Sequence, residues 1–520
     1  MSTPPPVLSR PPLYPSPVHG PWPTGTPWGR HWPGAGQPAT VGGVLAIAGA
    51  AVVAAISLPL DRAGIGWLVA AVAGVAALIM AGAIPARPHP DAPAPLVVRP
   101  PVRSRPDRYG WALATVALIG VGTVRSAGWL FLLCLATATL TGSLALAGGR
   151  SLRSIAAGYT MPVAAAFRSL PWLTRTAARV RKPVEAAANV RVAATVAVSL
   201  TLLVVFGALF ASADAAFAGA LERLSPEVSL PTTVRWIFVF AIATLGLGGA
   251  AFLRAGPPDL SALDATEGRK VNRFEWAVPL GLLVLLFAGF VTVQLTVLFG
   301  GNRHVLQTNG LTYAEYARSG FWQLSFVTAL TLIVLAGAAR WAPRAQPADR
   351  TTIRVVLGAL AALTLVIVGS ALHRMNLYAD TYGLTRLRLL VACCEAWFGL
   401  VLMLVLVAGV RIRAPWLPRV AIAAGVLALL GLAAANPDRM IAEHNIRQNR
   451  TVDLDYLGTL SPDVVPGLSG LSPDRRACVL SRINFDLAGA PDDWRGWNLG
   501  RQQARKVIAT ELSDPAYRCS

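Results

Sequence analysis

Long apolar runs dominate this chain between Val41 and Ala435. Each run is about 15 to 25 residues long, which is the length that a helix needs to cross a hydrocarbon core of roughly 30 Å. We place them at about 41–60, 66–84, 109–124, 127–148, 192–212, 233–253, 276–299, 320–339, 353–372, 387–409 and 417–435. The third run is short, and only Arg125 and Ser126 separate it from the fourth. The sequence therefore predicts an all-α, polytopic transmembrane helix bundle of about eleven spans.

Composition supports the same conclusion. Of the 520 residues, 54% are hydrophobic and 14% are charged, whereas soluble domains contain about 25% charged residues. The surplus apolar surface must face lipid, so the bilayer is the first expected partner. A soluble nucleic-acid-binding protein is excluded despite the net charge of +20, and we expect no nucleic acid as a partner.

The two ends of the chain differ from the apolar middle. Residues 1–40 contain twelve prolines, which predicts a disordered, partly polyproline II tail. The alternative is a ligand for a proline-recognising groove on a partner. Residues 436–520 mix polar and apolar side chains, and residues 501–512 have the pattern of an amphipathic helix. We expect a small helical module there.

Basic residues predict the orientation. With the N-terminus in the cytoplasm, the inner segments hold 26 Arg and Lys and the outer loops hold 9. This bias places the tail 1–40 inside and the module 436–520 outside the plasma membrane. The positive inner surface would attract anionic lipids at the cytoplasmic face, although the same charges are also explained as an insertion signal.

Polar residues that could carry a function gather at the predicted outer helix ends. We expect them to converge on an outer vestibule lined by Asp214, Glu315, Arg318, Arg374, Tyr378, Asp380 and Arg386. The alternative is a set of separate helix caps, since Thr312 and Glu315 have capping-box spacing. Glu395 is an acid well inside a predicted span, where a carboxylate is costly and is either functional or a structural hydrogen-bonding group.

Cysteine placement and motif searches limit the chemistry. Cys134, Cys393 and Cys394 lie in apolar runs, so only Cys478 and Cys519 are candidates for an extracytoplasmic disulfide. The chain contains no phosphate-binding Gly-Lys-Ser/Thr loop, no His-Glu-x-x-His and no Cys-x-x-Cys. We therefore expect no metal site and no cofactor, and the sequence leaves enzymatic activity open.

Several short segments resemble a bacterial multi-pass membrane family that is known only as domains of unknown function (families 4173 and 4153). They lie within residues 190–460, and the matching pieces are Ser212–Phe217, Gly310–Arg318, Tyr382–Arg388, Asn436–Asp438 and Asp453–Leu457. The family has no established activity. The resemblance therefore implies a shared topology and a shared outer polar face.

Three functions remain open at this point. A carrier or permease with an outward-facing vestibule predicts a polar path from the vestibule to Glu395. A non-transporting envelope or signalling component predicts a dry helix interior, with its polar groups confined to the loops. A membrane transferase acting on a lipid-linked substrate would need a vestibule that opens sideways to lipid.

Overall fold

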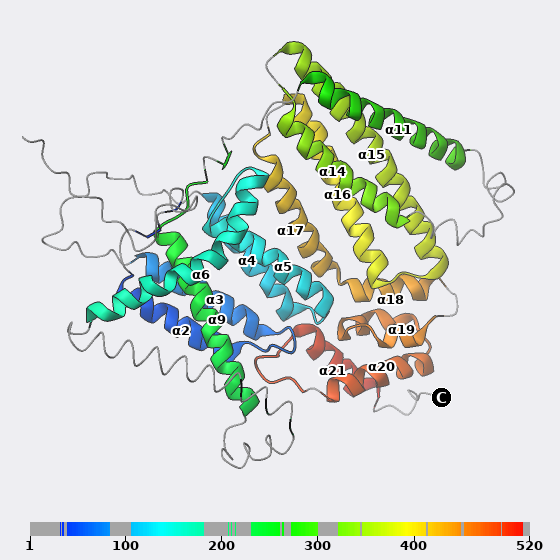
Figure 1. Cartoon of the computed structure of the whole chain (residues 1–520). Coiled ribbons are helices and arrows are strands. Elements are labelled where there is room, and N and C mark those ends of the chain that lie inside the picture. The colour runs from blue at the N-terminus through cyan, green and yellow to red at the C-terminus, as the bar shows by residue number, and fades with distance from the viewer. Residues whose placement is uncertain are drawn as a thin grey trace, which may run out of the picture.

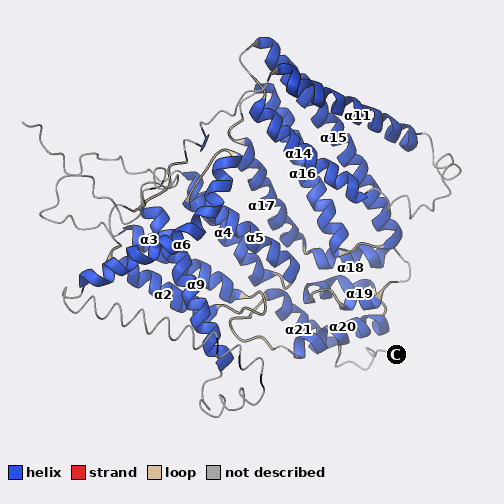
Figure 2. Ribbon diagram, viewed as in Figure 1, coloured by secondary structure: helices blue, strands red, loops and turns tan. Residues whose placement is uncertain are grey.

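Helices account for every regular element that the structure, a computed structural model, describes (Figure 2). The described residues are 32, 34–35, 39–83, 106–180, 206, 210, 214, 230–260, 263–264, 272–299, 321–343, 346–411, 414–448, 452–489 and 491–512. Within these ranges, eight helices are long and apolar enough to cross a membrane. They are α3 (Ile65–Ala83), α5 (Gly128–Leu146), α9 (Leu230–Ala255), α11 (Arg273–Phe299), α14 (Phe321–Trp341), α15 (Pro347–Tyr382), α16 (Arg386–Arg411) and α17 (Leu417–Ala435). The protein is therefore a multi-pass integral membrane protein.

The other described helices fall into two classes. Three lie among the eight: α2 (Val41–Ser57), α4 (Pro106–Val124) and α6 (Leu152–Val180). Five short ones follow α17: α18 (Pro437–Arg447), α19 (Leu454–Gly458), the 3-10 helix η1 (Pro462–Gly470), α20 (Pro473–Ala488) and α21 (Leu499–Glu511). Helices thus occur at ten of the eleven predicted spans, and the remaining one, 192–212, lies largely outside the described residues.

Helix α15 is longer than the predicted span 353–372. It has 36 residues, or about 54 Å at 1.5 Å per residue, which exceeds a hydrocarbon core of roughly 30 Å. Residues 373–382, which we expected to form an outer loop, are its last turns. They contain no Gly or Pro, and the helix ends only at Gly383, whose φ of 79° suits glycine.

The helices that precede α18 form two groups (Figure 1). Helices α2, α3, α4, α5, α6 and α9 contact one another in the first group, and α11, α14, α15 and α16 do so in the second. Helix α17 lies between them and contacts α16 on one side and α4 and α5 on the other. The five short helices form a layer across one end of the bundle, and we call residues 436–512 the C-terminal module.

Ion pairs join the helix ends on the face opposite the module. Arg419, at the start of α17, pairs with Asp107 at the start of α4 and donates to the Gly149 carbonyl at 2.7 Å. Arg273 and Asp349 pair at 2.9 Å and join the starts of α11 and α15. All these positions belong to segments that the charge distribution assigns to one side of the membrane.

Candidate functional site

The predicted vestibule residues are only partly brought together. Arg374, Tyr378 and Asp380 lie on the projecting end of α15, and Arg386 begins α16. Asp214 is described and exposed, but almost all of its neighbours in sequence are not described. Glu315 and Arg318 lie outside the described residues. The polar groups that do converge join the helix ends to the C-terminal module.

Arg386 is held by a buried carboxylate of the module. Its Nε and Nη2 donate to the two oxygens of Asp438 at 3.1 and 2.7 Å. Asp438 is 0% exposed and also accepts from the backbone N–H of Ser461 at 2.8 Å. A bidentate pair of this kind is both strong and geometrically specific. It fixes the start of α16 against the start of α18.

The α15–α16 loop receives two more contacts from the module. The Asn445 side chain accepts from the Leu384 N–H at 2.6 Å and donates to the Leu384 carbonyl at 3.0 Å. The Tyr456 hydroxyl accepts from the Arg386 N–H at 3.0 Å. Backbone groups that would otherwise lack partners at a helix start are thereby satisfied. This loop is therefore bound by both α18 and α19.

Asn436 makes the turn from α17 into the module. It has a φ of 57°, and it is the one non-glycine residue with positive φ in the described part of the chain. Asn tolerates this left-handed conformation better than most residues. Its Oδ1 accepts from the Arg439 N–H at 3.2 Å, and its Nδ2 donates to the Asp463 carbonyl at 2.9 Å. The segment Asn436–Asp438 therefore makes the turn after α17, begins α18 and supplies the carboxylate that binds Arg386.

Asp463 binds the module to the first helix group. Its Oδ2 accepts from the N–H groups of Ser126 and Ala127, in the α4–α5 turn, at 2.7 and 3.1 Å. The Ser461 hydroxyl donates to the same oxygen at 3.3 Å. Oδ1 has no hydrogen-bond partner among the described residues. The α4–α5 turn is consequently fixed by a carboxylate more than 300 positions away in the sequence.

The α2–α3 loop forms the third junction. Arg501 pairs with Asp492 at 3.0 Å and donates to the Ala63 carbonyl at 2.7 Å. The backbone N–H groups of Ile65 and Gly66 donate to carbonyls of the module at 2.9 and 3.0 Å. Thus both helix groups are bonded to the same module at the same face.

The end of α15 contacts the module more weakly. Asp380 accepts from the Gln448 side chain at 3.2 Å and lies 3.6 Å from His444. The Arg388 guanidinium lies over the Tyr378 ring, and its Cζ is 4.3 Å from the ring centroid. Asp380 is exposed, so its contacts are expected to contribute little to stability.

Glu395 is buried inside the second helix group. It is 1% exposed, and neither carboxyl oxygen has a hydrogen-bond partner among the described residues. The Ser325 hydroxyl of α14 approaches the carboxyl without reaching hydrogen-bonding geometry. Glu395 takes no part in the contacts described above between the helix ends and the C-terminal module.

Among the described residues, no group of three or more His, Cys, Asp or Glu side chains could hold a metal ion. Cys478 is disulfide-bonded, and Cys134, Cys393 and Cys394 are free. Cys519, the predicted partner of Cys478, lies outside the described residues.

Sequence reasoning selected Arg386 and missed the residues that hold it. Asp438 and Tyr456 lie in segments that carry the family resemblance, which is the signal that could have identified them. Asp463, Asn445 and Arg501 lie outside these segments and carry no such signal.

The pH dependence of module docking should be governed by Asp463. Burial raises its pKa above the ordinary value of 3.8, and hydrogen bonds from Ser126 and Ala127 offset only part of this effect. The folded state therefore binds the proton more tightly than the unfolded state. The resulting stability is fully present below the ordinary pKa and is lost as pH rises through the raised one.

We expect the melting temperature of the parent protein to rise, relative to that of Asp463→Asn, as the pH falls from neutrality toward the ordinary aspartate pKa of 3.8. The Asn variant cannot titrate, but its amide oxygen can still accept from the α4–α5 turn. Thermal unfolding in detergent across this range measures the difference. Parallel profiles for the two proteins would show that Asp463 does not couple docking to pH.

Comparison with family models identifies the chain as a member of DUF4153, a domain of unknown function, over residues 113–471. The match covers more than half of the chain, so the protein belongs to this family. It begins within α4 and ends just after η1, and it includes Arg386, Asp438 and Asp463. Comparisons with curated proteins and with solved structures found no match.

Proposed function

We propose that this member of DUF4153 is a non-transporting component of the cell envelope that holds its C-terminal module in a fixed position at the membrane surface. In this proposal the protein lies in the plasma membrane, with its N-terminus in the cytoplasm and its module outside. The arginine and lysine distribution supports the orientation.

One observation carries the proposal: the polar groups at the module face are bonded to one another. Asp438 and Asp463 are buried and join the module to α16 and to the α4–α5 turn, respectively. Groups engaged in this way are not free to bind a solute. Opening this face would break the Arg386–Asp438 pair and leave the Asp438 carboxylate without its counter-charge. It would also remove the acceptor of the Ser126 and Ala127 N–H groups.

In this proposal, exposed side chains of the module form a platform for a partner. Phe485 on α20 is 80% exposed, and Trp494 in the following loop is also exposed. Contiguous exposed apolar patches mark interaction surfaces, and in this proposal the two side chains belong to one such patch.

A proton-coupled carrier is the second candidate, and Glu395 is the observation that favours it. A buried carboxyl without a hydrogen-bond partner among the described residues is a candidate proton-binding group in a membrane protein. The carrier would require the contacts between the module and the helix ends to open, whereas the non-transporting component would not.

Proton flux and hydrogen exchange should separate the two candidates. In proteoliposomes under an imposed potential, we expect the parent protein and Glu395→Gln to show the same dye-reported proton flux as empty vesicles. In nanodiscs, the N–H groups of Leu384 and Ala127 should exchange as slowly as those of the module core. Proton flux that Glu395→Gln abolishes, together with fast exchange at these two amides, would support the carrier and overturn our proposal.

A further inference from the structure

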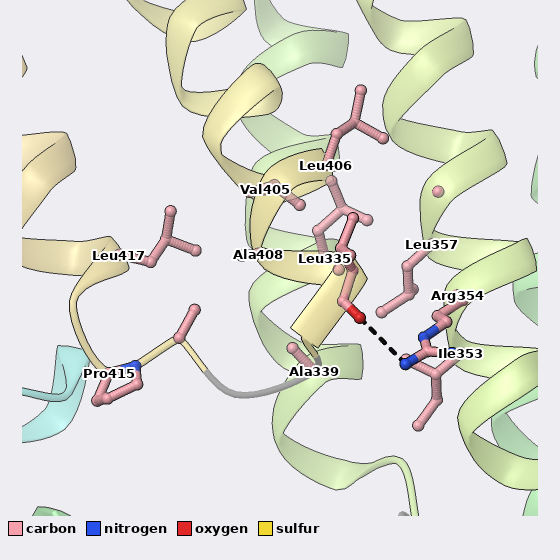
Figure 3. Close-up of a pocket in the computed structure, with 14 residues that line it drawn as sticks. Leu335, Ala339, Ile353, Arg354, Leu357, Val405, Leu406, Ala408, Pro415 and Leu417 are labelled. Atoms are coloured by element: carbon pink, nitrogen blue, oxygen red, sulfur yellow. Dashed lines mark hydrogen bonds between the residues drawn. The ribbon is translucent and has the colours of Figure 1, made fainter. Parts of the chain in front are cut away.

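A cavity of about 670 Å³ lies at the face of the bundle opposite the module. Figure 3 shows the residues that line it. It is formed by the ends of α14 and α16 and the starts of α15 and α17. Its volume falls within the range of about 300–1,000 Å³ that is usual for ligand pockets. The residues that form it are almost all apolar, and Arg354 is the one ionisable side chain among those that line it.

The walls of the cavity are shaped for a flexible apolar ligand. Leu335, Leu357 and Leu406 lie on three different helices around it. Gly358 and Gly409 also line it, and a Cβ added at either position would meet no atom within 4 Å. Leu335 precedes the end of α14 by six residues, so the cavity extends about 9 Å from that end along the helix.

Arg354 is placed to bind an anion at this cavity. Its Nη2 donates to the Val410 carbonyl at 3.0 Å (Figure 3), and a guanidinium has five N–H donors. No carboxylate pairs with it among the described residues, since the nearby Asp349 is engaged by Arg273. Arg350 lies one turn earlier on α15 and adds positive charge to the same helix face.

We propose that this cavity binds an anionic phospholipid, with one acyl chain in the cavity and the phosphate on Arg354. An inorganic anion would make no favourable contact with the apolar walls. A peptide segment at this depth would have to satisfy its backbone polar groups, and the lining offers few polar partners. A lipid with net negative charge matches both the apolar walls and the cation. This inference concerns the face opposite the module and does not depend on the proposed function.

Native mass spectrometry of the delipidated full-length protein in mild detergent tests the site. The probes are phosphatidylglycerol and phosphatidylcholine with identical acyl chains. We expect phosphatidylglycerol to bind about tenfold more tightly to the parent protein. Arg354→Gln should lower its affinity by about five- to tenfold, toward that of phosphatidylcholine.

A second variant tests the cavity without removing charge. Gly358→Leu places a side chain in the open space, and replacing a helical glycine favours the folded state. We expect this variant to melt no lower than the parent and to bind phosphatidylglycerol at least about tenfold more weakly. Arg482→Gln, at an exposed arginine of the module, is the matched control and should bind as the parent does.

Several outcomes would overturn the proposal. Equal binding of the two lipids, or unchanged phosphatidylglycerol binding by Arg354→Gln and Gly358→Leu, would exclude a specific anionic-lipid site here. Effective competition by glycerol phosphate, which lacks acyl chains, would indicate a phosphate site instead. Dimers of the parent that Gly358→Leu dissociates would indicate that a second copy of the chain fills the cavity.

Discussion

Replacing Arg386 with Met is expected to lower the free energy of unfolding of the module by about 3–5 kcal/mol. The Met side chain fills similar space but leaves the fully buried Asp438 without its counter-charge. Hydrogen exchange of α18 and α19, together with thermal unfolding in detergent, measures the loss. The module should undock before the membrane helices unfold.

A double-mutant cycle separates this pair from a general packing effect. Asp438→Asn removes the buried charge but keeps an acceptor for the Ser461 N–H. The double change Arg386→Met with Asp438→Asn should therefore be less destabilising than the sum of the two single changes, by about 1–3 kcal/mol. Arg439→Met is the control, because Arg439 forms an exposed pair with Glu443 on the same helix and should cost less than about 0.5 kcal/mol. A coupling energy near zero would show that the Arg386–Asp438 pair does not hold the module.

The second large effect is expected for Gly500→Ala. A Cβ at Gly500 would lie 1.8 Å from Oδ1 of Asp463 and 3.0 Å from its Cγ. That carboxylate cannot move away without breaking its bonds to the α4–α5 turn. We therefore expect a loss of about 3 kcal/mol or more in the free energy of unfolding, the upper part of the range for overpacked sites.

Gly489→Ala supplies the matched control in the same module. It follows α20, its φ is −64°, and the nearest atom to an added Cβ is 3.6 Å away. This change should be neutral or stabilising by up to about 1 kcal/mol. If both alanine variants melt alike, the close approach of α21 to Asp463 is not a determinant of docking.

The membrane helices were predictable because their signal is local. An apolar run long enough to cross a bilayer leaves its backbone no alternative to helix, and α17 occupies the predicted residues 417–435. Hydropathy reports only the part of a helix that lipid surrounds, so it missed the last ten residues of α15. The orientation, the pairing of Cys478 with Cys519 and the vestibule stay predictions.

Only the tertiary structure determines which polar groups join the helix ends to the C-terminal module. Arg386 could be selected from the sequence as a charge at a helix end, but nothing local indicates that its partner is Asp438, 52 residues later. The bond from Ser126 to Asp463 joins residues 337 positions apart. A hydrogen bond requires two groups within about 3 Å, and hydropathy specifies where helices lie in the membrane but not which ends meet. The sequence by itself therefore determined where the long apolar helices lie, and only packing of the module across both helix groups determined which of its polar residues are bonded.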